Sequence, residues 1–249
     1  MDVFLRSDGL TASEVLAALP YDVARSSNPG ALPDPKRYRD GRQLLRTVGL
    51  IYEGDDGRLR VTELGKAVAR WRPVLTPDNA AVIARHGAQA LAACQLRNPT
   101  REARKYGAEV EVFPFSFIWR AMLALDGVIS SDELNRAVFH TTNENDLIHA
   151  IQSIRTARES GDVTSMGEEV ESGPAKNDRV LVWMSWASFG WTLITDKRSS
   201  GNSMYAIAPK MRRVIEAIAP IRHRHREFES EADYFEHISA CAGLPEDLR

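Results

Sequence analysis

Two stretches of this chain repeat one pattern, in which a polar or basic helix is followed by a β-hairpin. In the clearer copy, within residues 37–71, the spacing of apolar residues predicts a helix over 37–48 that ends at Gly49. Strands are expected at 50–52 and 59–61, joined by a tight turn at Asp55-Asp56-Gly57. Thr62 is expected to cap the helix that follows.

The second copy, between Phe113 and Ile218, is looser. Thr142 is expected to begin its third helix. The apolar residues of that helix predict an inner face, and its polar residues predict an outer one. The inner face is expected to hold Leu147, Ile148, Ile151 and Ile154, and the outer face His149, Gln152, Ser153 and Thr156. The strands of this copy are expected at 180–186, 191–194 and 204–207.

A helical core followed by a two-stranded wing is the pattern of a winged helix, a fold that commonly places its last helix in a DNA groove. The sequence therefore predicts a mainly α (α+β) protein with tandem winged-helix domains and small β-hairpin wings. The expected divisions are a first winged-helix domain at 1–73, a connecting helix and linker at 74–108, a second winged-helix domain at 109–226 and an acidic C-terminal helix or tail at 227–249.

The composition argues against a membrane-spanning protein, a secreted protein and a cysteine-based metal site. The chain has 249 residues, 43% of them apolar, and no apolar run approaches the roughly 20 residues that span a bilayer. The first ten residues lack the pattern of a secretory signal. Cys94 and Cys241 lie far apart, which fits a reducing compartment and gives no metal-binding spacing. A cytoplasmic protein that does not contact membrane is expected.

Charge is segregated along the chain although the net charge is only −2. Residues 36–72 hold ten Lys/Arg against five Asp/Glu, whereas residues 227–249 hold one against seven. A local excess of five positive charges can face phosphates, although a solvated helix face would have the same composition.

Candidate DNA contacts are drawn from the expected recognition helices and wings. Lys and Arg bind phosphates, while Arg, Asn and Gln contact base edges in the major groove. In the first copy the candidates are Arg37, Arg39, Arg42, Gln43, Arg46, Arg58 and Arg60, and in the second they are Asn143, Asn145, His149, Gln152, Ser153, Arg155, Lys197, Arg198 and Asn202.

The segment from Asp40 to Ala69 carries a resemblance. Asp40-Gly41-x-x-Leu44-Leu45-x-x-x-Gly49-Leu50-Ile51, a short wing, and Leu59-x-Val61-Thr62-x-x-Gly65-x-Ala67 are similar to the DNA-recognition region of FokI-like type IIS restriction endonucleases. The resemblance implies tandem winged-helix subdomains that bind an asymmetric site, with a separate nuclease domain or subunit that cuts. It assigns no individual base contact.

The metal-binding PD-(D/E)xK pattern of such nucleases is missing from this sequence. Asp34-Pro35-Lys36 lies in an expected proline loop, and Glu63 and Lys66 have the wrong spacing on an expected helix. No catalytic residue, metal ligand or cofactor is therefore expected. His223 and His225 could bind a metal, but the arginines between and beside them disfavour a cation.

Three functions follow as alternatives. The first is sequence-specific binding of double-stranded DNA, as the recognition part of a restriction-modification system without its own nuclease site. The second is a winged-helix transcriptional regulator that dimerises through a helix at 76–96. The third is a protein-interaction module, and an enzyme with an unrecognised site also stays open.

Overall fold

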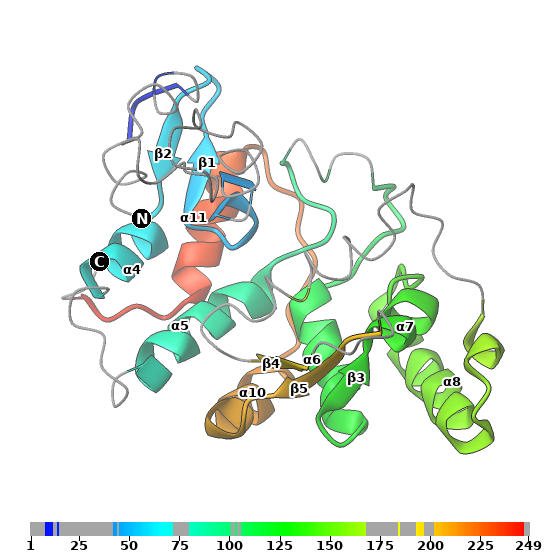
Figure 1. Cartoon of the computed structure of the whole chain (residues 1–249). Coiled ribbons are helices and arrows are strands. Elements are labelled where there is room, and N and C mark those ends of the chain that lie inside the picture. The colour runs from blue at the N-terminus through cyan, green and yellow to red at the C-terminus, as the bar shows by residue number, and fades with distance from the viewer. Residues whose placement is uncertain are drawn as a thin grey trace, which may run out of the picture. The chain divides into compact units, whose positions relative to one another are not determined.

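The chain forms a mainly helical α+β fold, as expected, in a computed structural model (Figure 1). The structure describes residues 8–11, 14, 42–43, 45–71, 80–100, 103, 106–167, 184, 193–196 and 202–246. These residues divide into two compact units: the first unit comprises residues 1–79 together with 228–249, and the second comprises residues 80–227. Each unit is described separately below.

The first unit is built around a β-hairpin. Its strands are β1 (Ile51–Glu53) and β2 (Leu59–Val61), which pair antiparallel with Ile51 opposite Val61. The expected turn is confirmed, since the amide of Gly57 donates to the carbonyl of Gly54 at 2.8 Å. Ile51 and Leu59 form the small core beneath the hairpin, with Leu10 among the side chains packed on it.

Gly49 ends the helical stretch that precedes β1, as the sequence predicts. Its φ of +77° is left-handed, and the amides of Gly49 and Leu50 donate to the carbonyls of Arg46 and Leu45. This is a Schellman motif, which glycine favours because it lacks a Cβ. A Cβ at this position would also lie 2.9 Å from Cγ2 of Ile238. The glycine therefore both turns the chain and admits a neighbouring helix.

The next helix, α4 (Glu63–Trp71), begins at the expected cap. The hydroxyl oxygen of Thr62 accepts from the amide of Gly65 at 3.0 Å, and the same hydroxyl donates to the carbonyl of Gly49 at 2.7 Å. A Cβ on Gly65 would lie 2.2 Å from the carbonyl oxygen of Leu50. The Thr-x-x-Gly motif thus fastens α4 closely against the start of the hairpin.

The C-terminal helix α11 (Glu231–Cys241) belongs to the first unit, in which it packs on β1 and α4 (Figure 1). Phe235 and Ile238 are fully buried, and the ring of Phe235 stacks on that of Tyr52 with centroids 5.9 Å apart. This grouping differs from the sequence-based division, which set residues 227–249 apart as a separate acidic helix or tail. Asp233 and Glu236 of this helix face solvent, while its apolar residues complete a core made mostly by a segment far away in sequence.

The second unit combines helices with a three-stranded antiparallel sheet of order β3-β5-β4. Its first strand follows directly on a helix, and its other two strands form a hairpin late in the unit. In chain order the elements are α5 (Ala80–Ala93), α6 (Pro114–Ala124), β3 (Val128–Ser130), α7 (Ser131–Glu133), the π-helical turn η2 (Leu134–Val138), the 3-10 turn η3 (Glu144–Asp146), α8 (Leu147–Ser160), the 3-10 turn η4 (Val163–Met166), β4 (Leu193–Asp196), β5 (Met204–Ile207), the 3-10 turn η5 (Pro209–Met211) and α10 (Arg212–Ile218).

Strand β3 was not expected from the sequence. It pairs with β5, with Ile129 opposite Tyr205. Its last residue, Ser130, is also the cap of α7, since its hydroxyl accepts from the amide of Glu133 and the Glu133 carboxylate accepts from the amide of Ser130. Because Ser130 belongs to both elements, the sequence pattern revealed the helix but not the strand. Within the expected strand 180–186, the single described residue, Met184, is helical.

Helix α5 packs inside the second unit against α6 and α10. Ala84, Ala88 and Leu91 are at most 1% exposed, so these apolar residues of the helix are covered within the chain. Pairing of the helix at 76–96 with a second copy, the alternative drawn from the sequence, stays a prediction. The core around it holds Phe115, Trp119 and Ile215, all fully buried.

Candidate nucleic-acid interface

Helix α8 lies at the margin of the second unit (Figure 1). Ala150, Ile151, Ile154 and Ala157 are at most 6% exposed and form the stripe that holds the helix on the unit. The expected inner face was wrong at one position, because Ile148 is 53% exposed. The exposed residues of this segment are Asn145, Ile148, His149, Gln152, Arg155, Thr156, Arg158, Glu159 and Ser160, while the candidate Ser153 is half-buried.

The start of this helical segment is set by Asn143 rather than by Thr142. The side chain of Asn143 accepts from the amide of Asn145 at 2.9 Å, and the carboxylate of Asp146 accepts from the amide of Asn143 at 3.2 Å. This reciprocal cap occupies the amide oxygen of Asn143. The expected DNA contact at Asn143 therefore falls on a side chain with a structural role in this conformation.

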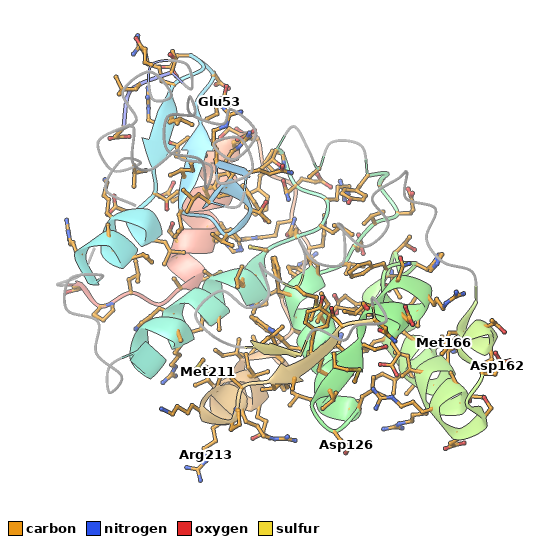
Figure 2. The ribbon with its side chains drawn as sticks, viewed as in Figure 1. Glu53, Asp126, Asp162, Met166, Met211 and Arg213 are labelled. Carbon is orange, nitrogen blue, oxygen red and sulfur yellow. The ribbon has the colours of Figure 1, made fainter. Side chains whose placement is uncertain are left out.

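Two arginines brace α8 against the rest of the unit. Arg158 donates to both carboxylate oxygens of Glu133, at 2.7 and 3.0 Å, and its hydrogen bonds to Glu133 raise the pKa of the guanidinium. Arg155 donates to the carbonyl of Ala124 at 2.8 Å, while its side chain stays exposed. Ala124 ends α6, whose following turn carries the exposed Asp126 (Figure 2). These contacts fix the orientation of the outward face of α8.

The hairpin of β4 and β5 is attached to α7 by Asn202. Its amide oxygen accepts from the hydroxyl of Ser131 at 2.8 Å and lies 3.4 Å from the amide nitrogen of Asp132. Asn202 thus has a positioning role that the sequence did not reveal. The two basic candidates of the hairpin tip, Lys197 and Arg198, lie outside the described residues.

A basic segment, Arg222–Arg226, runs beside the start of α8. It alternates, with Arg222, Arg224 and Arg226 exposed and His223 and His225 half-buried. The Arg222 guanidinium lies 3.4 Å from the carboxylate of Glu144, in the turn immediately before α8. This contact places the Arg222 guanidinium at the amino end of that helix.

The histidines of the basic segment face the protein. The ring centroid of His223 lies 5.6 Å from that of Phe113, and burial lowers the pKa of His223, with Glu144 opposing this shift. A ring nitrogen of His225 lies 3.3 Å from the side-chain nitrogen of Gln95, whose oxygen accepts from the amide of Arg226. The inward rings therefore secure the strip from which the arginines project.

From the sequence, residues 222–226 are interpreted as a phosphate-facing or solvated stretch, but they were left out of the candidate contacts because their charge was not summed with that of α10. Residues 209–226 contain six Lys/Arg and one Glu. Arg213 points away from α10 (Figure 2), whereas Arg212 pairs with Glu216 one turn along the helix, at 2.9 Å. A charge window placed over 209–226 would have revealed the region.

The first unit presents its candidates differently. Arg46 is 7% exposed and donates twice to the carboxylate of Glu231 in α11, at 2.9 Å each. The expectation that Arg46 lies on an outer, DNA-facing side is corrected by this burial. Arg42 is partly buried and lies 3.9 Å from the Glu53 carboxylate, while Gln43 is exposed. Arg37 and Arg39 lie outside the described residues.

The wing arginines of the first unit are held by an aspartate. A side-chain nitrogen of Arg60 lies 2.7 Å from the Asp56 carboxylate, and Arg58 contacts both Asp56 and Glu14 at about 4 Å. The hydrogen bond from the backbone amide of Arg58, followed by that from the Arg60 side chain, lowers the pKa of Asp56. Much of the positive charge counted in this hairpin is therefore compensated locally.

Neither a metal centre nor a membrane span is found in the described part of the chain. No group of three or more His, Cys, Asp or Glu side chains there is arranged to bind a metal ion. No helix among the described residues combines the length and the apolar character that crossing a membrane requires.

The fold is similar to that of a solved protein–DNA complex. No family model and no curated protein matches the sequence. The BpuJ1 endonuclease binding domain, crystallised with pyrene- and phenanthrene-modified DNA, superposes with a TM-score of 0.58 at 12% identity over 98% of this chain and 90% of that one. At this identity the similarity concerns the fold. It agrees with the coarse expectation of a restriction-enzyme recognition fold, and the narrower FokI-like resemblance stays a prediction.

Proposed function

We propose that this protein binds double-stranded DNA in a sequence-specific manner, as the recognition part of a restriction system. The observation that carries the proposal is the outward face of α8, where His149 and Gln152 project from a helix fastened by a buried stripe. Side chains of these types can contact base edges in the major groove, whose width admits an α-helix. The binding domain with the similar fold was crystallised with DNA.

The topology of the second unit supports assigning it as a winged helix. Its elements follow the order helix, strand, helix, helix and two strands, from α6 through β5, and the first strand pairs with the last. In this assignment α8 is the recognition helix and the hairpin of β4 and β5 is the wing. Recognition then rests mainly on the second unit, because Arg46 of the first unit is committed to Glu231.

The basic segment supplies the contacts to the DNA backbone in this proposal. Arg222, Arg224 and Arg226 are exposed, and Arg222 lies beside the start of α8, where a helix lying in the groove has phosphates on both sides. Neutralising phosphates releases bound counterions and makes affinity depend on salt concentration. The histidines and Gln95 beneath hold the arginines in place.

Selection from a randomised pool of duplexes by the full chain tests this function. We expect one asymmetric sequence to be enriched, and Gln152→Ala to relax selectivity at one position of that sequence at a cost of about 1–3 kcal/mol. The matched control is Thr164→Ala, an exposed polar residue whose hydroxyl contacts Asp162 instead. Recovery of unselected, random sequences at physiological salt would contradict the proposal.

The basic segment gives a separate prediction. Replacing Arg224 with alanine is expected to weaken binding to every duplex and to reduce the slope of log K against log salt concentration by about 0.9, the value for one lost phosphate contact. Arg212→Ala serves as the control, because this exposed arginine already pairs with Glu216. Titrations at four or five salt concentrations give the slopes, and equal slopes for the two variants would remove the segment from the interface.

A further inference from the structure

Ile148 is the unusual member of the outward face of α8. It is 53% exposed, although the buried stripe of the helix begins only two positions away at Ala150. A single exposed apolar residue needs no explanation by itself. Here, however, it stands one helical turn before Gln152, and side chains four positions apart lie on the same face of a helix.

The pair matches the chemistry of an A·T base pair. In the major groove adenine offers an acceptor and a donor that a glutamine amide can bind together, while thymine offers a carbonyl and an apolar C5-methyl group. We infer that Ile148 contacts the C5-methyl group of a thymine in the recognised site, an inference that rests on the proposed DNA-binding function. Gln152 contacts an adenine edge beside it.

The charges around Ile148 fit a DNA partner. The exposed residues from Asn145 to Thr156 include no carboxylate, and Arg155 adds a positive charge, while the exposed Glu159 lies only in the last turn of α8. The carboxylates on either side of Asn145 are engaged, Glu144 by Arg120 and Arg222, and Asp146 by the amide of Asn143. Phosphates can therefore approach this face without meeting an uncompensated acidic side chain from the start of the helix.

Other occupants fit the surface less well. A protein partner normally covers an apolar patch with several large side chains, and the outward face of α8 offers one isoleucine among polar residues. A methyl group on cytosine would be paired with guanine, for which a glutamine amide is not the usual partner. The methyl group that Ile148 contacts is therefore assigned to thymine.

Replacing thymine by uracil tests the contact, because uracil lacks only the methyl group. The full chain is titrated with the duplex obtained by selection, in which each thymine is replaced in turn. At one position we expect affinity to fall about fourfold, the equivalent of one buried methyl group. Ile148→Ala should lower affinity for the unmodified duplex by a similar or larger factor and remove the difference between thymine and uracil at that position.

Val163→Ala is the matched control. Val163 is a second β-branched residue with comparable exposure, 45%, but it lies in η4, beyond the far end of α8. This variant should keep the full sensitivity to uracil. Because Ile148 and Val163 are both exposed, neither replacement is expected to change the stability of the fold substantially.

The possible results separate the inference from the function on which it rests. Specific binding with no sensitivity to uracil, with a sensitivity that survives in Ile148→Ala, or to a site without thymine overturns the methyl contact and leaves the proposed function standing. A gain in affinity from 5-methylcytosine that depends on Ile148, without any effect of uracil, also overturns it. The absence of selective binding to any duplex overturns both.

Discussion

Replacing Arg46 with alanine is expected to lower the free energy of unfolding of the first unit by about 3 kcal/mol. Removing one partner of a buried ion pair leaves the other charge uncompensated, and this typically costs about 3–5 kcal/mol. The side chains of Arg46 and Glu231 are 8% and 14% exposed, and the residual exposure of Glu231 favours the lower end of that range. Urea unfolding with hydrogen exchange of peptides from residues 51–71 and 231–241 measures the change in this unit.

A matched exposed pair and a double variant define the cause. Lys66→Ala removes the partner of Glu63 in a pair that is 43% and 50% exposed, and we expect a change below about 0.5 kcal/mol. Replacing both Arg46 and Glu231 by alanine should recover part of the loss, because neither charge is then left alone. A loss for Arg46→Ala no greater than that for Lys66→Ala would show that the buried pair does not hold α11.

Gly65→Ala is expected to cost about 3 kcal/mol in the same unit. On an exposed helix this replacement would stabilise by roughly 1 kcal/mol, so the sign itself is diagnostic. The new methyl group would lie 2.2 Å from the carbonyl oxygen of Leu50, which already accepts from the amide of Thr62 at 3.1 Å. The backbone cannot retreat without breaking that hydrogen bond, and overpacking of this kind costs about 1–3 kcal/mol or more.

Gly57→Ala separates steric overlap from backbone strain. Gly57 has a φ of +71°, and no atom lies within 4 Å of the place that a Cβ would occupy. Alanine there should cost about 1–2 kcal/mol through backbone conformation alone. The φ of Gly65, by contrast, is outside the left-handed region. Denaturant unfolding of the two variants should therefore rank Gly65→Ala as the more damaging, and the reverse order would contradict the close packing of α4.

Local signals were predictable from the sequence. The turn before Arg58, the end of the helix at Gly49 and the Thr62 cap were recognised because each is decided by a few neighbouring residues. Strand β3 was missed because Ser130 is both the last residue of a strand and the cap of a helix. A short strand whose partner is more than seventy residues away leaves little periodicity to detect.

Long-range packing decided the sites that sequence analysis placed differently. Arg46 has the appearance of an outward helix residue until Glu231, 185 positions later, is packed against it. Ile148 was assigned inward together with Ile151 and Ile154, but the buried stripe runs through the latter two and leaves Ile148 53% exposed. Both residues lie at the edge of an apolar stripe. Helical periodicity alone does not determine whether such a residue is buried or exposed.

The division of the first unit into two distant segments has a consequence for its synthesis. The hairpin and α4 leave the ribosome before residues 80–227, and α11 follows only after them. At about 5–20 residues per second, the surface of the hairpin and α4 that contacts Phe235 and Ile238 stays exposed for roughly 7–30 s before α11 is synthesised. The second unit, which is translated between the two segments of the first unit, can therefore complete its folding before the first unit does. Until α11 packs on it, the apolar surface of the hairpin is a binding site for a chaperone.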